Sequence, residues 1–296
     1  MKILLLGKDG QVGRELQCTL PSLGQLIALG HSEADLENLE ELARTLQAHA
    51  PDLIVNAAAY TAVDEAESDE TTANKINAQA VRIMAHYAQT NNALLVHYST
   101  DYVFDGEKNG PYTEQDIPNP QNAYGRSKWA GEKAILCSGC NALIFRTSWV
   151  FSVHGSNFIK SIVQLTQERP SINVVADPTG APTSATLIAD LTAQAIAAWQ
   201  QHALPEGIYH LTATGHTTWH KLAIHVVERL HGQGAALKLH PSRIFPITTE
   251  EYASPAKRPK NSRLATDKLQ LALGVKIPCW ADHVNRVTDQ LAHFDT

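Results

Sequence analysis

Tyr124 and Lys128 lie four residues apart and have the side chains of an acid-base pair. Residues at this spacing share one face of a helix, so the phenol and the ammonium point the same way. A free tyrosine has a pKa of about 10 and is a poor acid-base catalyst at neutral pH, but a nearby ammonium stabilises its phenolate. The spacing therefore predicts proton transfer by Tyr124. The same pattern is also common in helices where the two residues are only an amphipathic pair.

The segment before this helix adds hydroxyl and carboxyl groups. His97-Tyr98-Ser99-Thr100-Asp101 lies at the carboxyl end of a predicted strand, where open α/β sheets place their binding sites. The hydroxyl of Ser99 or Thr100 can hydrogen-bond a substrate carbonyl and the hydroxyl of Tyr124. Capping of a helix or turn is the alternative role, but Tyr102-Val103-Phe104 continue as an apolar run. We therefore predict a catalytic role.

A glycine-rich turn, Gly7-x-x-Gly10-x-x-Gly13, joins the first predicted strand to the first predicted helix. Glycines allow a tight turn and let the backbone touch a pyrophosphate. The helix N-terminus then offers free N–H groups and a partial positive charge. Because this is the first strand-to-helix turn of an alternating chain, it predicts a dinucleotide site more strongly than an unliganded turn.

The end of the second predicted strand bears on the choice of cofactor. An acidic residue usually stands there and holds the hydroxyls of the adenosine ribose. Here the position is Gly30, and the nearest acids are Glu33 and Asp35. A missing carboxylate removes repulsion against a 2′-phosphate, and Lys8 can attract one. We therefore expect NADPH, or use of both NADPH and NADH; the alternative is that Gly30 says nothing about preference.

Strands and helices alternate along the first half of the chain. The expected strands are 2–6, 25–29, 52–56, 93–104 and 142–151, and the expected helices are 11–20, 36–49, 71–90 and 123–136. The strands are apolar on both faces, as in a buried parallel sheet. We expect an α/β fold with a Rossmann-type doubly wound parallel sheet, formed by residues 1–150 and roughly 184–213. Residues 151–183 and 214–296 are expected to form a smaller C-terminal substrate-binding lobe.

Composition narrows the class of protein. The chain has 296 residues and a formal net charge of −6, which argues against a nucleic-acid partner. No apolar run is long enough to span a membrane, and Ile3–Leu6 is too short for a signal peptide. We therefore expect a cytoplasmic protein with reduced cysteines.

Cysteines and histidines predict no metal site. Cys137-Ser-Gly-Cys140 has no second pair to complete a zinc site. A turn with two ordinary thiols is the favoured interpretation, and a redox pair is the alternative. The spacing of the fourteen histidines is not that of metal ligands.

Together these motifs resemble the extended short-chain dehydrogenase/reductases and, within them, the dTDP-4-dehydrorhamnose reductase family. The resemblance covers nearly the whole chain. Its markers are Gly7–Gly13, Asn56–Asp64, His97–Phe104, Tyr124–Lys128, Phe145–Val150, Gly180–Thr183 and Arg258–Leu264. The glycine turn and the Tyr124–Lys128 pair alone mark only the superfamily, whereas the full set is specific to the subfamily.

The resemblance implies NAD(P)H-dependent reduction of the C4 ketone of dTDP-4-dehydro-β-L-rhamnose to dTDP-β-L-rhamnose, the last step of dTDP-rhamnose biosynthesis. The resemblance makes Tyr124 the donor of a proton to the C4 oxygen, and Thr100 would tune the pKa of Tyr124. Lys128 would hold the ribose and lower the pKa of Tyr124. The implied cofactor-binding residues are Gly7, Gly10, Gln11, Val12, Gly13, Asp35, Leu36, Ala59, Tyr60, Thr61, Tyr98, Tyr124 and Lys128.

The substrate contacts rest on weaker signals. The resemblance places Thr100, Asp101 and Trp149 against the sugar, and a tryptophan can stack on an apolar sugar face, although most tryptophans pack in a core. Asn261 and Arg263 lie in a basic run that can meet the substrate diphosphate; a solvated surface is the alternative. Some family members dimerise through a metal at acidic residues near the first helix, so a homodimer with interfacial Mg²⁺ stays open.

Two alternatives to this reductase remain. One is another nucleotide-sugar reductase or epimerase of the same fold. The other is a non-catalytic regulatory subunit similar to the β subunit of methionine adenosyltransferase. The presence of Thr100, Tyr124 and Lys128 favours catalysis.

Overall fold

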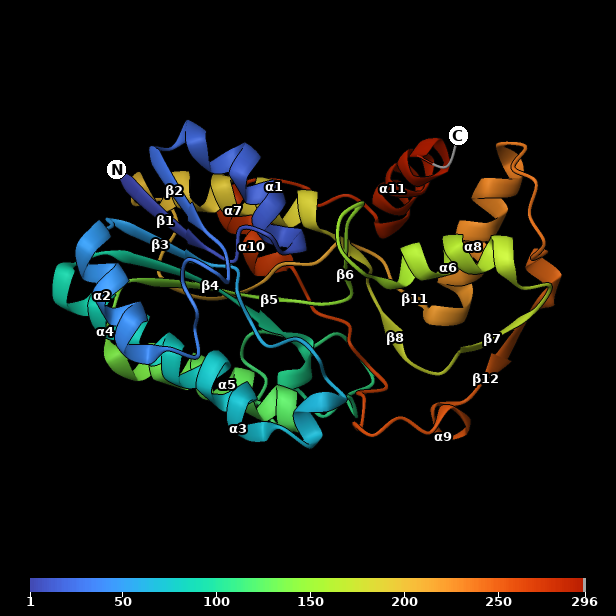
Figure 1. The fold of residues 1–296 in the computed structure, drawn as a ribbon, viewed down its shortest axis with the longest axis horizontal. Coiled ribbons are helices and arrows are strands. Elements are labelled where there is room, and N and C mark those ends of the chain that lie inside the picture. Colours follow the sequence, from blue (N-terminus) through green and yellow to red (C-terminus); the bar gives the residue numbers. More distant parts are fainter. Residues whose placement is uncertain (295–296) are drawn as a thin grey trace.

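A six-stranded parallel sheet forms the centre of the computed structural model, which describes residues 1–294. The strand order is β10-β5-β4-β3-β1-β2 (Figure 1). The strands are β1 (Lys2–Leu6), β2 (Gln25–Leu29), β3 (Leu53–Asn56), β4 (Leu94–Thr100), β5 (Ala142–Thr147) and β10 (Gly207–His210). Every neighbouring pair in this sheet is parallel.

Helices cover both faces of the sheet, which explains why its strands are apolar on both sides. Ile3 and Leu5 of β1 pack into one core, and Leu4 and Leu6 pack into the opposite one. The first core is covered by α1 (Gln11–Thr19), α7 (Ala185–Gln200) and α10 (Asp267–Leu273), and the second by α2 (Leu39–His49), α4 (Ala80–Asn91) and α5 (Ala123–Ser138). Figure 1 shows these two helical layers above and below the strands. The predicted doubly wound α/β sheet is confirmed.

The strand order changes direction at β1, which lies between β2 and β3. Leu5 pairs with Ala28 on one side and with Val55 on the other. A parallel sheet opens a crevice beyond the carboxyl ends of its strands at such a point. The glycine turn after β1 lies at this crevice.

Most expected elements differ from the structure by up to three residues at an end, and three differ more. The expected strand 93–104 ends at Thr100, and a 3-10 turn, Asp101–Val103, follows it. The expected strand 142–151 is interrupted, because Trp149 has a φ of 48° and separates β5 from the short β6 (Val150–Phe151). The expected helix 71–90 consists of α3 (Glu70–Asn74), a π-helical turn and α4.

The remaining elements form a smaller lobe with its own core. It contains β6, α6 (Phe158–Glu168), β7 (Ile172–Val175), β8 (Thr179–Gly180), β9 (Thr183–Ser184), β11 (Thr217–Thr218), α8 (Trp219–Gly232), β12 (Ile244–Ile247), α9 (Thr249–Tyr252) and α11 (Trp280–Phe294). Ile162, Val226 and Val284 join α6, α8 and α11 in this core. α10 falls in the range 214–296, yet its Leu269 packs in the core of the large sheet.

Candidate active site

A cleft of about 510 Å³ runs along the carboxyl ends of the strands, from Gly30 after β2 to Tyr124 and Lys128 on α5. Most of the cofactor-binding residues expected from the sequence line it: Gly7, Gly10, Gln11, Val12, Asp35, Leu36, Ala59, Thr61, Tyr98, Tyr124 and Lys128. Gly13 and Tyr60 are not part of the lining. The cleft thus brings the glycine turn and the acid-base pair into one site.

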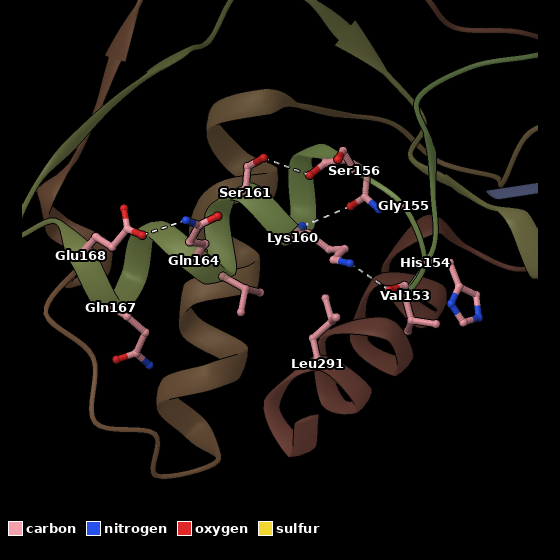
Figure 2. Close-up of a pocket in the computed structure, with 12 residues that line it drawn as sticks. Val153, His154, Gly155, Ser156, Lys160, Ser161, Gln164, Gln167, Glu168 and Leu291 are labelled. Carbon is pink, nitrogen blue, oxygen red and sulfur yellow. Dashed lines mark hydrogen bonds between the residues drawn. The ribbon is translucent and has the colours of Figure 1, made fainter. Parts of the chain in front are cut away.

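A larger cavity, of about 900 Å³, lies in the smaller lobe beside α6 and α11 (Figure 2). Lys160, Gln164 and Leu291 line it, and Lys160 Nζ donates to the carbonyl of Val153 at 3.2 Å. None of the expected catalytic residues lies there. Position relative to the acid-base pair, and not volume, therefore identifies the site.

The glycine turn fits a pyrophosphate because two of its positions have no room for a side chain. Gly7 has a φ of +85°, and a Cβ there would lie 2.6 Å from the backbone nitrogen of Ala58. A Cβ at Gly13 would lie 2.0 Å from the carbonyl oxygen of Gly7. No side chain caps the N-terminus of α1 at Gly10. The first N–H groups of α1 are therefore free to bind phosphate oxygens.

The N-terminus of α5 places Tyr124 and Lys128 at the cleft. Asn122 begins the helix, and its side chain accepts a hydrogen bond from the N–H of Gly125 at 2.7 Å. Lys128 is buried, and its Nζ donates to the carbonyl of Tyr98 at 2.6 Å. Burial lowers the pKa of Lys128 to about 8, and the charge of Glu132 opposes that change.

Tyr124 remains a phenol at neutral pH in this site. Burial raises its pKa to about 12, whereas a hydrogen bond with the Thr100 side chain lowers it. Asp101 adds a further rise through its charge. Loss of hydration is the largest of these causes, and Lys128 is not among them. The lowering of this pKa by Lys128 stays a prediction. A protonated phenol suits a residue that donates a proton.

The hydroxyls at the end of β4 have different roles. Ser99 is buried at the wall of the cleft, and its Oγ donates to Glu132 Oε1 at 2.5 Å, so its one hydrogen is already used within the protein. Thr100 Oγ1 accepts from the N–H of Tyr102 at 3.2 Å and caps the 3-10 turn. The prediction that no helical turn follows Thr100 was therefore wrong. Thr100 both caps this turn and hydrogen-bonds Tyr124.

Asp101 is buried at the same strand end. Burial raises the pKa of its carboxyl group to about 6. Hydrogen bonds from Ser262 and Thr100 oppose this rise. The charge of Asp101 raises the pKa of Tyr124, and contact of Asp101 with the sugar stays a prediction.

Sequence reasoning missed the partners of Lys128. His97 Nε2 lies 3.4 Å from Lys128 Nζ, and His97 Nδ1 lies 3.2 Å from the amide nitrogen of Asn56. The amide oxygen of Asn56 accepts from the N–H of Ala58 at 3.2 Å, which fixes the orientation of the amide. Nδ1 must then accept the Asn56 hydrogen, so Nε2–H faces Lys128. Asn56 ends β3 and pairs in register with His97 in the middle of β4, and no spacing in the sequence links the two residues.

A buried ion pair fixes α5 against the sheet. Arg146 Nη2 lies 2.6 Å from Glu132 Oε2, and Arg146 Nε lies 2.9 Å from Glu132 Oε1. Both side chains are almost completely buried. Glu132 follows Lys128 by one helical turn, so this pair holds the catalytic face of α5 over β4 and β5. The repeat of Tyr124, Lys128 and Glu132 at intervals of four was the signal in the sequence.

Trp149 lies outside the lining of the cleft, on the side of the smaller lobe. Its ring stacks on Trp219 with centroids 3.7 Å apart and an interplanar angle of 15°. A Cβ at Gly180 would lie 2.5 Å from the Trp149 ring. Trp149 is thus held between two segments of the smaller lobe and remains partly exposed.

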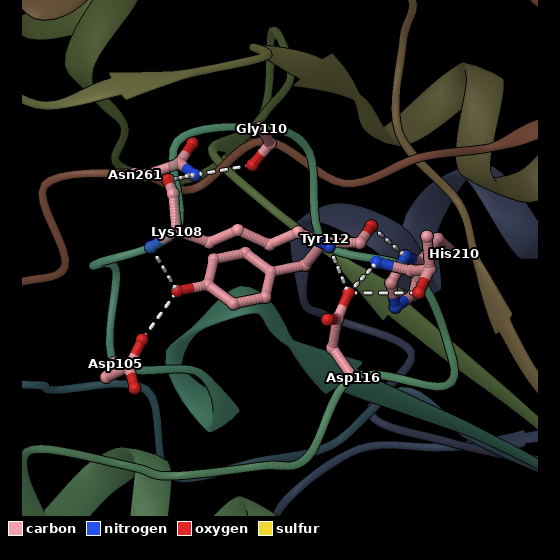
Figure 3. Close-up of polar contacts among 8 residues, drawn as sticks. Asp105, Lys108, Gly110, Tyr112, Asp116, His210 and Asn261 are labelled. Carbon is pink, nitrogen blue, oxygen red and sulfur yellow. Dashed lines mark hydrogen bonds and ion pairs between the residues drawn. The ribbon is translucent and has the colours of Figure 1, made fainter.

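Asn261 and Arg263 hold a loop through hydrogen bonds within the protein. Asn261 Nδ2 donates to the carbonyls of Lys108 and Gly110 at 2.7 and 2.8 Å (Figure 3). Arg263 Nε donates to Asn261 Oδ1 at 2.8 Å, and Arg263 Nη2 donates to the carbonyl of Asn109. Both residues are thus part of the support of the 108–110 loop.

The described part of the chain has free cysteines, but neither a group of metal ligands nor a membrane-spanning helix. Cys137 and Cys140 are free thiols at the end of α5, and Gly139 between them has a φ of +70°. Within residues 1–294 there is no group of three or more His, Cys, Asp or Glu side chains that could hold a metal ion. No helix in that range is long and apolar enough to cross a membrane.

A Rossmann-type sheet, a glycine turn and the Thr100–Tyr124–Lys128 group define a short-chain dehydrogenase/reductase. The family model described as RmlD substrate binding domain matches residues 1–293. A dTDP-4-dehydrorhamnose reductase of Burkholderia thailandensis is 46% identical over 284 residues, 95% of each chain. The chain belongs to the dTDP-4-dehydrorhamnose reductase family.

Solved structures agree with this assignment. A dTDP-4-dehydrorhamnose reductase from Clostridium acetobutylicum has a TM-score of 0.90 and 33% identity, with 98% of this chain and 99% of that chain covered. The dTDP-4-dehydrorhamnose reductase from Bacillus anthracis, solved in complex with NADP, has a TM-score of 0.87 and 32% identity with the same coverage. The predicted family and the enzyme class, an NAD(P)-dependent oxidoreductase, are confirmed.

Proposed function

We propose that this protein reduces the C4 ketone of dTDP-4-dehydro-β-L-rhamnose to dTDP-β-L-rhamnose with NADPH or NADH, the last step of dTDP-rhamnose biosynthesis. The observation that carries the proposal is the position of Tyr124 and Lys128, one helical turn apart on α5, in the same cleft as the glycine turn. Family membership supports the choice of substrate. The bound cofactor supplies the hydride that reaches C4.

The chain's own residues bind and supply the proton. Gly10, Gln11 and Val12 cradle the pyrophosphate. The N–H of Gly10 donates to the carbonyl of Gly7 at 3.1 Å and shapes the turn, and the N–H groups of Gln11 and Val12 bind the phosphate oxygens, because the start of α1 has no side-chain cap. Asp35 and Leu36 border the adenine end of the cleft. Lys128, fixed by the carbonyl of Tyr98, holds the ribose at the nicotinamide end.

Proton transfer is assigned to Tyr124. Its hydroxyl donates a hydrogen bond to the C4 oxygen and transfers the proton as the oxygen gains negative charge. Thr100 contacts the same hydroxyl and tunes its pKa. Asp101 and Trp149 are proposed sugar contacts, and Asn261 and Arg263 contribute by holding the 108–110 loop near the substrate.

The cellular location, the assembly and the partner of the protein complete the proposal. The four free cysteines fit a reducing compartment such as the cytoplasm. A homodimer, with or without interfacial Mg²⁺, also remains a proposal. A dTDP-sugar is the proposed partner, on the strength of family membership.

The test follows oxidation of NADPH and NADH, in parallel, with the dTDP-ketosugar as substrate. We expect turnover with this ketone, and a Tyr124→Phe variant should lose roughly 10²–10⁴-fold in kcat while it still binds the dinucleotide. Full turnover by this variant would contradict the mechanism. Interconversion of sugars without net cofactor consumption would identify an epimerase, and a stable synthetase partner with no turnover would identify a regulatory subunit.

A further inference from the structure

The space beside Gly30, at the end of β2, is occupied by a carboxylate from another segment. A Cβ placed on Gly30 would lie 2.1 Å from Asp9 Oδ2 and 3.3 Å from Lys8 Cε. Asp9 belongs to the glycine turn, and both Asp9 and Gly30 line the cofactor cleft. Gly30 therefore leaves room for the carboxyl group of Asp9, at the place where a side chain from β2 would otherwise begin.

Lys8, which could attract a 2′-phosphate, is already paired. Its Nζ forms an ion pair with Glu33 Oε2. The same Glu33 oxygen accepts a hydrogen bond from the N–H of Gly30 at 2.8 Å. The hydrogen bond from Lys8 lowers the pKa of Glu33, so this carboxyl group stays ionised at neutral pH. The ammonium of Lys8 is thus compensated, and a second cation, Arg14, donates from its Nε to the backbone carbonyl of Asp9 at 3.2 Å.

The remaining charges make this corner acidic. Asp35 lines the cleft, and the largely exposed side chain of His31 lies beside it, with His31 Nδ1 3.8 Å from Asp35 Oδ1. Asp9, Glu33 and Asp35 therefore contribute three carboxylates, against the two permanent cations Lys8 and Arg14. A 2′-phosphate on the adenosine ribose is repelled by such a group, whereas free ribose hydroxyls can donate hydrogen bonds to Asp9.

We propose that Asp9 takes the role of the acid missing from the end of β2, and that this protein prefers NADH to NADPH. The Asp9 carboxylate accepts hydrogen bonds from the adenosine ribose hydroxyls, and Glu33 keeps Lys8 from pairing with a 2′-phosphate. This inference rests on the proposed NAD(P)H-dependent function. It reverses the preference expected from Gly30 and Lys8 in the sequence.

The test measures binding without any sugar substrate. Dissociation constants for NADH and NADPH are obtained from quenching of protein fluorescence, and 5′-AMP and 2′,5′-ADP are compared as competitors of NADH. We expect the wild type to bind NADH and 5′-AMP more tightly than their 2′-phosphorylated counterparts. An Asp9→Asn variant should shift the NADPH-to-NADH affinity ratio toward NADPH on the order of tenfold, because it removes the repulsion and leaves only a neutral amide oxygen, a weaker acceptor for the ribose hydroxyls.

Two further variants separate local contacts from net charge. Glu33→Gln frees Lys8 and should tighten binding of NADPH and 2′,5′-ADP with little change for NADH and 5′-AMP. Glu40→Gln removes the same charge from the exposed first turn of α2 and should leave the ratio unchanged. A wild type that binds NADPH as tightly as NADH, or an unchanged ratio in Asp9→Asn, overturns the inference alone. If neither dinucleotide binds, the proposed function fails with it.

Discussion

The surroundings of Lys128 disfavour the charged form of its side chain relative to the neutral amine. It is 2% exposed, and one strong acceptor, the carbonyl of Tyr98, holds its Nζ. The Nε2–H of His97 faces the same nitrogen, because the Asn56 amide occupies the other side of the ring. A neutral amine can accept that hydrogen, whereas an ammonium cannot. The position of His97 and the burial of Lys128 thus both favour the neutral amine over the ammonium.

This environment predicts how stability depends on pH. The pKa of Lys128 falls from 10.5 to about 8 on folding, so the unfolded chain binds more protons between these values. The resulting penalty is fully present below about pH 8 and disappears as the pH rises to about 10.5. Relative to a Lys128→Met variant, the wild type should therefore gain stability over this range, by on the order of 3 kcal/mol.

The measurement is urea unfolding of both proteins at several pH values. Other groups titrate alike in the two proteins and cancel in the difference. A difference that stays constant from pH 7 to pH 11 would mean that Lys128 keeps an ordinary pKa in the folded protein.

At the scale of elements, α5 joins the chemistry to the sheet. Its buried face carries Lys128 and, one turn later, Glu132. Glu132 accepts from Arg146 on β5 and from Ser99 on β4. The helix that supplies the acid-base pair is therefore attached to both strands that border the catalytic end of the cleft.

Removal of the charge on Glu132 should destabilise this attachment. A Glu132→Gln variant leaves the buried guanidinium of Arg146 without a counter-charge, and we expect a loss of roughly 3–5 kcal/mol in the free energy of unfolding. Addition of Arg146→Met should recover much of this loss, because the unpaired charge is then gone. Denaturant titration of the single and double variants checks this. A double variant less stable than the single would show that the pair is not coupled in this way.

At the scale of the whole molecule, the cleft belongs to the large sheet, and the smaller lobe meets it near Trp149. Trp149 follows β5, and Trp219 begins α8 of the smaller lobe. Their stacked rings also contact Phe158 through Trp219, with centroids 4.7 Å apart. This aromatic group therefore joins the chain leaving the sheet to the core of the smaller lobe.

Loss of this contact should affect the lobe but not dinucleotide binding. A Trp219→Ala variant should lose roughly 2 kcal/mol of stability, less than for a fully buried tryptophan, because the ring is partly exposed. We expect a higher KM for the sugar, since Trp149 loses its support, and unchanged affinity for NADH. Trp219→Phe, which keeps a ring in place, is the matched control. A large loss of NADH affinity in Trp219→Ala would show that the two lobes do not bind their ligands separately.

Local sequence determined the elements and much of the cleft. The apolar runs of β1 to β5 determined a buried parallel sheet, since only strands covered on both faces can be apolar on both faces. The glycine spacing determined the turn, because Gly7 and Gly13 have no room for a Cβ. The spacing of Tyr124 and Lys128 determined that they share a face. These features depend on residues close together in the chain, so their patterns could be recognised without coordinates.

Tertiary structure decided the properties that depend on distant residues. Ser99 is bound to Glu132, Lys128 lies against His97, and the carboxylate of Asp9 fills the space beside Gly30. The pKa of Tyr124 rises because the fold removes water from its hydroxyl. Desolvation and contacts between separate elements exist only after the chain has folded. The sequence therefore determined that Tyr124 and Lys128 form a pair, and the fold decided that the pair is desolvated, which raises the pKa of Tyr124 and lowers that of Lys128.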